Sequence, residues 1–134
     1  MTHTPLRVLC VDDNRDAADS ESVLLELLGY DAAVSYDGPE ALAEALRFGP
    51  DVCLVDYNMP GMNGCEFARR LRALRRGRPV YLIAVTANSS DQVRGLTAAA
   101  GFNLHLVKPV DWDELSTILE NLDHARGRGE LVSR

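Results

Sequence analysis

The stretch DVCLVDYNMPGMNG (residues 51–64) joins an apolar run to an acidic residue and a loop rich in glycine. Asp56 stands where the apolar run ends, and Pro60, Gly61 and Gly64 follow it. A carboxylate at the end of a buried strand carries a desolvation cost unless a positive group lies beside it. The stretch therefore predicts either that another part of the chain brings a cation to Asp56, or that Asp56 is exposed at the end of its strand.

Similar apolar runs recur along the whole chain, at LRVLCV (6–11), AAVSY (32–36), VCLV (52–55), VYLIAV (80–85) and LHLV (104–107). They are continuous rather than alternating, which is typical of parallel strands covered on both faces. The segments between and after them have helical periodicity. Their expected apolar stripes are Leu24, Leu27 and Leu28; Leu42, Ala45 and Leu46; Phe67, Leu71 and Leu74; Val93, Leu96 and Ala100; and Leu115, Ile118, Leu119 and Leu122. This alternation predicts an α/β fold with one parallel sheet between two layers of helices.

Two of the expected helices have a recognisable start. Asn63 stands three residues before Glu66, and Asp111 stands three residues before Glu114. This is the spacing of a capping box, with Asn and Asp in place of the usual Ser or Thr. After Leu122 the periodicity is lost. We therefore expect one domain over residues 1–122 and a flexible tail over residues 123–134.

Composition excludes several classes of protein. Of its 134 residues, 46% are hydrophobic and 25% are charged, as in ordinary globular domains. The net charge of −6 disfavours direct binding of nucleic acid. Its three cysteines form no CxxC pair, which favours free buried thiols in a reducing cytoplasm. No apolar run is long enough to span a membrane or resembles a secretion signal. These features predict a cytoplasmic protein without a direct membrane or nucleic-acid partner.

Polar residues follow four of the five expected strands. In an open parallel sheet, functional groups gather at the carboxyl ends of the strands. Three carboxylates brought together there repel one another unless a cation joins them, and a few hard oxygen ligands suit Mg²⁺ (or Mn²⁺) better than a softer metal. The residues concerned are Asp12 and Asp13 after the first run, Asp56 after the third, Thr86 after the fourth, and Lys108 with Pro109 after the fifth.

Each of these signals has a structural alternative when it is taken alone. Asp12 and Asp13 suit a turn and helix cap, and Thr86 suits a hydroxyl bonded to nearby backbone. Lys108 is the single lysine beside thirteen arginines, which indicates either a site too narrow for a guanidinium or chance in an arginine-rich composition. The joint pattern favours function. By contrast, RRLRALRRGRP (69–79) is expected to form a solvated helix face rather than a nucleic-acid site.

Together these motifs resemble the receiver domain of two-component response regulators, over residues 6 to about 122. The resemblance implies a flavodoxin-like, doubly wound sheet of five parallel strands in the order 2-1-3-4-5, with five helices. It implies that Asp56 accepts a phosphoryl group from a histidine kinase or a histidine phosphotransfer protein, assisted by Thr86 and Lys108. The implied Mg²⁺ ligands are Asp13, Asp56 and the backbone carbonyl of Asn58, with Asp12 acting through water. The Lys108–Pro109 bond is implied to be cis.

The resemblance also assigns a switch and a lifetime control. Thr86 moves toward the phosphoryl group, and an aromatic residue three positions before the lysine swings inward with it. Here that position is His105, which acts either as a neutral, inward-moving imidazole or as an inert, partly exposed residue. Asn58 and Asn88 flank the path of attacking water and carry no charge, so neither acts as a general base.

The leading interpretation is a phosphorylation-dependent switch, not an enzyme, that is monomeric or weakly dimeric. We expect it to signal to a protein target through the face of the fourth helix, fifth strand and fifth helix. The chain is expected to be a stand-alone regulator or the receiver of a hybrid kinase, because no output domain follows Leu122. The alternatives are a receiver-like binding module that is not phosphorylated, and an aspartyl-phosphate hydrolase. Asn58 disfavours the hydrolase, because such enzymes carry a second acid at that position.

Overall fold

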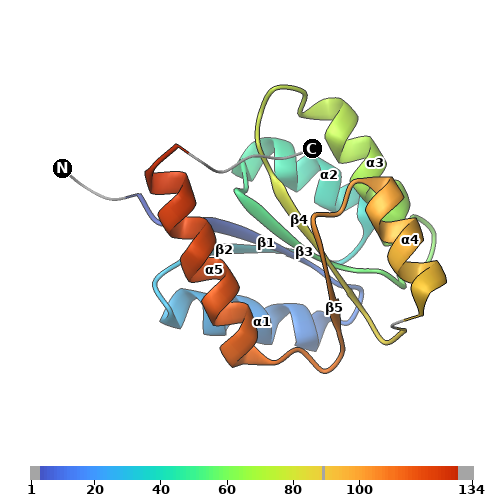
Figure 1. The fold of residues 1–134 in the computed structure, drawn as a ribbon, viewed down its shortest axis with the longest axis horizontal. Helices are drawn as coiled ribbons and strands as arrows, with labels where there is room; N and C mark the ends of the chain where they lie inside the picture. The colour runs from blue at the N-terminus through green and yellow to red at the C-terminus, as the bar shows by residue number, and fades with distance from the viewer. Residues whose placement is uncertain (1–3, 89, 130–134) are drawn as a thin grey trace.

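The computed structural model describes residues 4–88 and 90–129, and its helices and strands form three layers (Figure 1). The five strands pair in parallel, as their apolar sequences predict. Their order is β2-β1-β3-β4-β5, as the resemblance to receiver domains implies. None of the helices in the described ranges is long and apolar enough to cross a membrane. In chain order the elements are β1 (Arg7–Val11), α1 (Arg15–Leu27), β2 (Asp31–Ser35), α2 (Gly38–Phe48), β3 (Val52–Asp56), α3 (Gly64–Leu74), β4 (Tyr81–Thr86), α4 (Asp91–Ala100), β5 (Leu104–Val107) and α5 (Trp112–Gly127).

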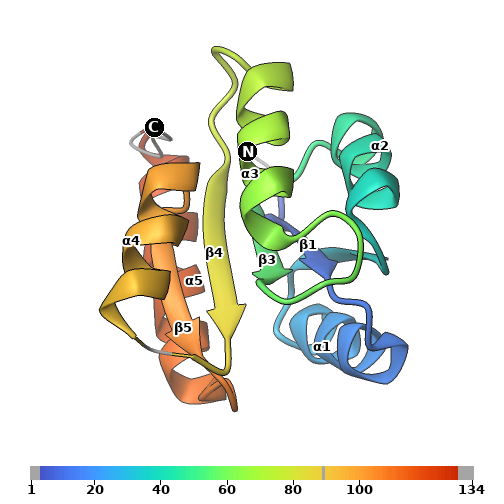
Figure 2. The ribbon, with the colours of Figure 1, turned by 90° about the vertical axis from the view of Figure 1, so that its right-hand side faces the viewer.

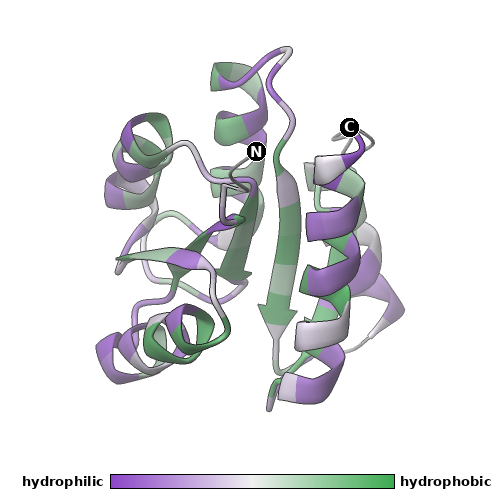
Figure 3. Ribbon diagram, turned by 90° about the vertical axis from the view of Figure 1, so that its left-hand side faces the viewer, coloured by the Kyte–Doolittle hydropathy of each residue, from purple (hydrophilic) through white to green (hydrophobic). Residues whose placement is uncertain are grey.

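The sheet is covered on both faces, which explains why its strands are apolar without alternation. Helices α1 and α5 lie on one face, and α2, α3 and α4 lie on the other (Figures 1 and 2). Each face has its own core cluster: Leu25 and Leu119 belong to the first, and Phe67 and Leu71 to the second. Figure 3 shows the same arrangement as apolar strands between helices whose outer faces are polar. The strand ends are therefore held rigidly at the two edges of the sheet.

The predicted helix starts at Asn63 and Asp111 are N-caps. Asn63 Oδ1 accepts a hydrogen bond from the Glu66 N–H at 3.0 Å, and Asp111 Oδ1 accepts one from the Glu114 N–H at 3.2 Å. The Glu66 carboxylate does not complete a capping box, because it binds the guanidinium of Arg70 at 2.8 Å instead. The local sequence therefore fixed where these helices begin, and the N-cap residue alone supplies the cap.

The predicted apolar stripe of α1 is wrong. Leu24, Leu27 and Leu28 are 40%, 77% and 50% exposed, whereas Ala18 and Leu25 are fully buried. The segment LLELL offers leucines on more than one side of the helix, so periodicity alone does not select the face that meets the sheet. Single members of three other predicted stripes are also exposed, namely Leu46, Leu74 and Leu96.

Helix α5 continues five residues beyond Leu122, so residues 123–127 do not belong to a flexible tail. Arg126 explains the extension, because its guanidinium links the end of α5 to the rest of the domain. It forms ion pairs with Asp123 at 3.0 Å and Asp51 at 3.6 Å, and it donates a hydrogen bond to the Thr4 carbonyl. Flexibility of residues 130–134 stays a prediction, since these lie outside the described residues.

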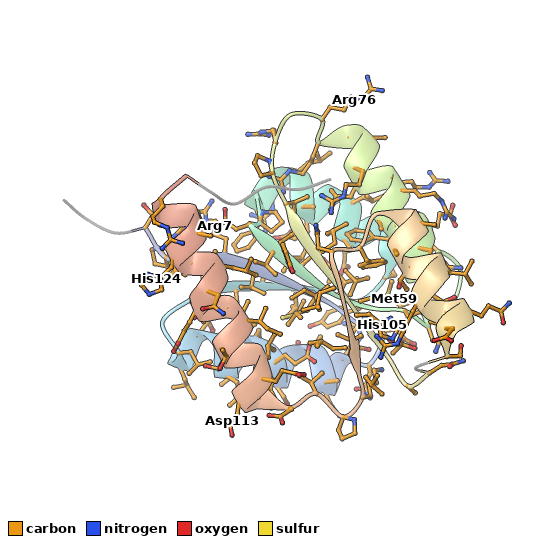
Figure 4. All side chains as sticks on the ribbon, viewed as in Figure 1. Arg7, Met59, Arg76, His105, Asp113 and His124 are labelled. Carbon is orange, nitrogen blue, oxygen red and sulfur yellow. The ribbon has the colours of Figure 1, made fainter. Side chains whose placement is uncertain are left out.

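The arginine-rich stretch 69–79 is only partly a solvated face. Arg72 donates to the carbonyl oxygens of Val80 at 2.6 Å and Gly101 at 2.7 Å, and Arg75 donates to that of Pro50 at 2.8 Å. These two side chains therefore satisfy backbone acceptors at the amino-terminal edge of the sheet. The remaining arginines are exposed, as Figure 4 shows for Arg76; they are Arg69, Arg70, Arg76 and Arg78.

Candidate functional site

The carboxyl edge of the sheet brings together the polar residues expected there. Asp12 follows β1 directly, Asp56 and Thr86 are the last residues of β3 and β4, and Lys108 follows β5. The order β1-β3-β4-β5 makes these four strands consecutive neighbours in the sheet. Segments that lie far apart in the sequence thus end side by side because the strands are parallel and in register.

Three carboxylates form the centre of the site. Carboxylate oxygens of Asp12, Asp13 and Asp56 all lie within 4.8 Å of one another. Asp12 and Asp56 are buried, each with 6% of its surface exposed, while Asp13 is exposed. Two local hydrogen bonds hold the buried pair, from the Asn14 N–H to Asp12 Oδ1 at 3.0 Å and from the Asn58 N–H to Asp56 Oδ1 at 3.2 Å. A set of hard oxygen donors this close together has the chemistry of a Mg²⁺ site.

The cation that Asp56 requires is Lys108. The Lys108 ammonium lies 3.3 Å from Asp56 Oδ1, and this pairing settles the two alternatives raised by residues 51–64. Burial and the neighbouring Asp12 carboxylate raise the pKa of Asp56 to about 6, although Lys108 and the Asn58 N–H favour the ionised form. One ammonium therefore does not fully compensate the three carboxylates, so the site still attracts positive charge.

The loop after Asp56 is fixed by backbone contacts. The Tyr57 N–H donates to the Val85 carbonyl of β4 at 2.9 Å, and the Gly64 N–H donates to the Tyr57 carbonyl at 3.1 Å. A Cβ atom on Gly64 would lie 3.1 Å from the Asp56 carbonyl oxygen, so a glycine allows this close approach. Gly61 has a φ of +78°, in the left-handed region that favours glycine. The two glycines thereby return the chain to α3 within a short loop that contains Asn58.

Thr86 and Lys108 are held by the ends of β4 and β5. Thr86 is fully buried, and its Oγ1 accepts a hydrogen bond from the Asn88 N–H at 3.1 Å, which leaves the hydroxyl proton free for another acceptor. The Lys108 N–H donates to the Thr86 carbonyl at 2.8 Å, and the Lys108–Pro109 peptide bond is cis, as the resemblance implied. The Asn88 side chain accepts a hydrogen bond from the Ser90 N–H at 2.8 Å.

His105 is directed from β5 toward α4 and is not a freely exposed side chain (Figure 4). Its Nδ1 lies 3.4 Å from the hydroxyl of Thr97, a residue of α4 that is almost completely buried. Its Nε2 is buried and makes no hydrogen bond of normal geometry within residues 4–88 and 90–129, although the Asn88 backbone lies close enough to favour the protonated ring. Burial, and secondarily the charge of Arg94, lower the pKa of His105 from its usual value, which favours the neutral imidazole. His105 is partly exposed, and the choice between an inward-moving imidazole and an inert residue stays a prediction.

Sequence reasoning missed Glu21. This half-buried residue of α1 faces the site, and burial together with the charge of Asp12 raises its pKa to about 7. It follows Ala18 by three residues and precedes Leu25 by four, so it shares the buried side of α1 with them. The signal was present in the sequence, but it depends on choosing Ala18 and Leu25 as the inner face of the helix.

Comparison with known proteins identifies the arrangement. The family model for the response regulator receiver domain matches residues 8–120. The chain belongs to the response regulator receiver domain family. Membership in that family makes this chain a receiver domain of two-component signalling. The prediction made from the residues at the strand ends is therefore confirmed at the level of family and fold.

Curated relatives and solved structures agree with this assignment. The transcriptional regulatory protein PrrA of Mycobacterium bovis is 37% identical over 124 residues, which cover 92% of this chain and 52% of PrrA. The sensory transduction protein RegX3 of Mycolicibacterium smegmatis is 39% identical over 108 residues, covering 81% of this chain and 46% of RegX3. The receiver domain thus spans about half the length of the curated relatives it matches.

Two solved structures show the same fold. The chemotaxis protein CheY4 of Vibrio cholerae is 31% identical with a TM-score of 0.82, covering 88% of this chain and 98% of that chain. The receiver domain of the sensor histidine kinase PA1611 of Pseudomonas aeruginosa is 33% identical with a TM-score of 0.79, covering 90% of this chain and 99% of that chain. The latter structure has a magnesium ion coordinated in its active-site cleft.

Proposed function

We propose that this receiver domain accepts a phosphoryl group on Asp56 from a histidine kinase or a histidine phosphotransfer protein. The observation that carries the proposal is the Asp56 carboxylate itself, buried among two further carboxylates with the Lys108 ammonium 3.3 Å away. A purely structural acid would not need a cluster of like charges, which costs stability. Phosphorylation of Asp56 then changes the contacts that the domain makes with a protein target.

The acidic cluster supports a role for Mg²⁺, with Mn²⁺ as a substitute. Asp13, Asp56 and the backbone carbonyl of Asn58 would hold the ion, and Asp12 would act through a water molecule. The clustered carboxylate oxygens fit a hard divalent cation, and the PA1611 receiver domain carries magnesium in its cleft. When bound, the ion supplies positive charge to the oxygens of the incoming phosphoryl group.

The side chains around Asp56 have separate tasks in the transfer. An Asp56 carboxylate oxygen forms a bond to phosphorus as the bond between phosphorus and the donor's imidazole nitrogen breaks, and the imidazole recovers a proton from water. Lys108 pairs with one phosphoryl oxygen in place of the carboxylate that it now contacts. The Thr86 hydroxyl donates its proton to a second phosphoryl oxygen. This proton is free because the hydroxyl takes part in its present hydrogen bond, from the Asn88 N–H, only as an acceptor.

Thr86 and His105 connect the site to the surface used for output. Movement of Thr86 toward the phosphoryl group would be followed by His105, which packs against Thr97 of α4. The face formed by α4, β5 and α5 exposes Leu96 by 49% and Val107 by 37%, which suits a protein target. We also infer a cytoplasmic location, which is supported by three free cysteines that are all buried. We infer further that the protein is monomeric or weakly dimeric.

The proposed activity is that of a switch rather than a multiple-turnover enzyme. Asn58 and Asn88 flank the expected path of the attacking water, and neither side chain can act as a general base. Slow loss of the phosphoryl group therefore depends on access of water to Asp56. Both asparagines are proposed to set the lifetime of the phosphorylated state.

Intact-mass spectrometry with acetyl phosphate and Mg²⁺ tests the assignment of Asp56. One phosphoryl group should appear on the wild-type chain, and none on Asp56→Asn or on wild type treated with EDTA. Asp113→Asn is the matched control, because Asp113 points into solvent at the start of α5 (Figure 4). Full labelling of Asp56→Asn, or labelling that does not depend on a divalent metal, would overturn the assignment.

A further inference from the structure

The loop between β3 and α3 rests on the start of α2 through the side chain of Met62. A Cβ atom added to Gly38, a buried residue of α2, would lie 2.6 Å from Met62 Sδ and 2.8 Å from Met62 Cγ. Side-chain atoms do not approach one another so closely, so the thioether fills the space that a side chain at position 38 would need. Met62 also packs against the core cluster between the sheet and α2, α3 and α4. The contact therefore leaves no room for an added atom on the side of the sulfur that faces Gly38.

Met62 carries the most accessible sulfur among those in residues 4–88 and 90–129. It is partly exposed, whereas Met59 and Cys65 are each 6% exposed, and Cys10 and Cys53 are fully buried. Burial also raises the pKa of all three thiols, that of Cys53 to about 12, so little of the reactive thiolate is present at pH 7. A thioether reacts with a peroxide without losing a proton, so its rate depends mainly on exposure. Met62 should therefore react before the other four sulfurs.

Met62 belongs to the same short loop as Asn58. A hydrogen bond from the Gly64 N–H to the Tyr57 carbonyl closes this loop at 3.1 Å, and the Met62 side chain seats it on α2. A sulfoxide oxygen adds volume and a strong dipole to this apolar contact, so the oxidised side chain no longer fits against Gly38. The loop then loses its support on α2. The Asn58 carbonyl, which we propose as a Mg²⁺ ligand, is no longer held in place.

We propose that Met62 is an oxidation site through which hydrogen peroxide lowers the affinity of the domain for its metal ion. The sulfur lone pair attacks one peroxide oxygen, the O–O bond breaks, and proton transfer to the departing oxygen yields methionine sulfoxide and water. The sulfur is oxidised by two electrons and the peroxide is reduced by two, and methionine sulfoxide reductases reverse the change. The functional consequence rests on the proposed function, because it takes the ion to be the Mg²⁺ that assists phosphorylation of Asp56.

Peptide mapping tests which sulfur reacts. The protein is treated with hydrogen peroxide in EDTA, the reaction is stopped with catalase, and the tryptic peptide of residues 48–69 is fragmented in a mass spectrometer. This peptide contains Met59, Met62, Cys53 and Cys65, so four sulfurs are compared in one molecule. Sulfoxide should form on Met62 about tenfold faster than on Met59, and the two rates should converge in urea, where burial is lost. Equal rates in the folded chain, a difference that persists in urea, or faster oxidation of a cysteine would each overturn the proposal.

Binding of Mn²⁺, followed by the EPR signal of the free ion, tests the consequence without requiring phosphorylation. Oxidation of Met62 should lower the affinity about tenfold, as when a metal ligand loses its outer support, and methionine sulfoxide reductases should restore it. Peroxide should leave the affinity of Met62→Leu unchanged, whereas Met59→Leu should stay as sensitive as wild type. Met62→Gln, which introduces a polar group of similar length, should bind Mn²⁺ weakly without peroxide. An affinity that survives oxidation of Met62, a loss that persists in Met62→Leu, or no binding to the reduced wild type would each overturn the proposal.

Labelling with acetyl phosphate separates this proposal from the assignment of Asp56 as phosphoacceptor. At a Mg²⁺ concentration below saturation, labelling should slow severalfold in oxidised wild type and remain unchanged in peroxide-treated Met62→Leu. Equal labelling rates for oxidised and reduced wild type would refute the role of Met62 while the phosphoacceptor assignment stands. Failure of reduced wild type to become labelled would instead contradict the proposed function, and peptide mapping and Mn²⁺ binding would still decide the role of Met62.

Discussion

Replacing Asp56 by asparagine should stabilise the fold at neutral and alkaline pH when no divalent metal is bound. Burial and Asp12 raise the pKa of Asp56 from 3.8 to about 6, so the folded chain holds this proton more tightly than the unfolded chain does. The resulting contribution to stability is fully present below pH 3.8 and is lost as pH rises through about 6. Ionised Asp56 is therefore a net cost to the metal-free domain at pH 7 to 8.

The size of this cost follows from the change in pKa. Each pKa unit corresponds to about 1.4 kcal/mol, so a rise from 3.8 to about 6 corresponds to about 3 kcal/mol. The pKa of about 6 already includes the favourable effect of Lys108, so the loss of that contact is not a further cost. We therefore expect the variant to gain about 3 kcal/mol in free energy of unfolding at pH 8.

Urea unfolding in EDTA between pH 4 and 8 measures this difference. The gap between Asp56→Asn and wild type should be small at pH 4, grow through pH 6 and level off by pH 8. Glu26→Gln, which removes one exposed charge from a chain of net charge −6, is the control and should show no such rise. Added Mg²⁺ should then stabilise wild type more than Asp56→Asn. A variant that is less stable than wild type at pH 8, or a gap that does not change with pH, would refute the electrostatic argument.

Three further predictions concern decay, packing and pH. Asn58→Lys and Asn88→Glu, made separately, should each change the half-life of the phosphorylated state severalfold in a mass-spectrometric time course, and unchanged decay in both would exclude a role for these positions. Arg72→Met should lower the free energy of unfolding, measured in urea, by about 2 to 4 kcal/mol because it leaves the Val80 and Gly101 carbonyls unpaired. The control Arg70→Met removes only an exposed ion pair and should lower the same free energy by less than about 0.5 kcal/mol. The lowered pKa of His105 means that protonation of this one residue costs stability as pH falls below about 6.5, so the free energy of unfolding of His105→Phe should rise relative to that of wild type between pH 7 and 5; parallel pH profiles would show that protonation of His105 does not matter.

The arrangement of the site was predictable because it depends on a rule of parallel sheets. Apolar runs without alternation fixed the sheet type, and the residue that follows each run must lie at the carboxyl edge. Asp12, Asp56, Thr86 and Lys108 needed no further information to be placed together, and the structure finds them there. The N-cap at Asn63 was equally predictable, since its hydrogen bond spans three residues of the same segment.

Other features depend on partners that are distant in sequence, so local pattern could not define them. Arg72 has the same helical surroundings as its exposed neighbour Arg70, and only the approach of the Val80 and Gly101 carbonyls makes it structural. Likewise, α5 extends past Leu122 because Arg126 reaches acceptors elsewhere in the domain.

The sequence of α1 by itself determined an amphipathic helix but left open which leucines face the sheet. The sheet accepts Leu25 and leaves Leu24, Leu27 and Leu28 in solvent, because the helix can present only one side to the strands that it covers. That same rotation turns Glu21 toward the acidic site. The chemistry at the strand ends was thus encoded locally in the sequence, whereas Glu21 acquired its position beside the site from how the helix packs.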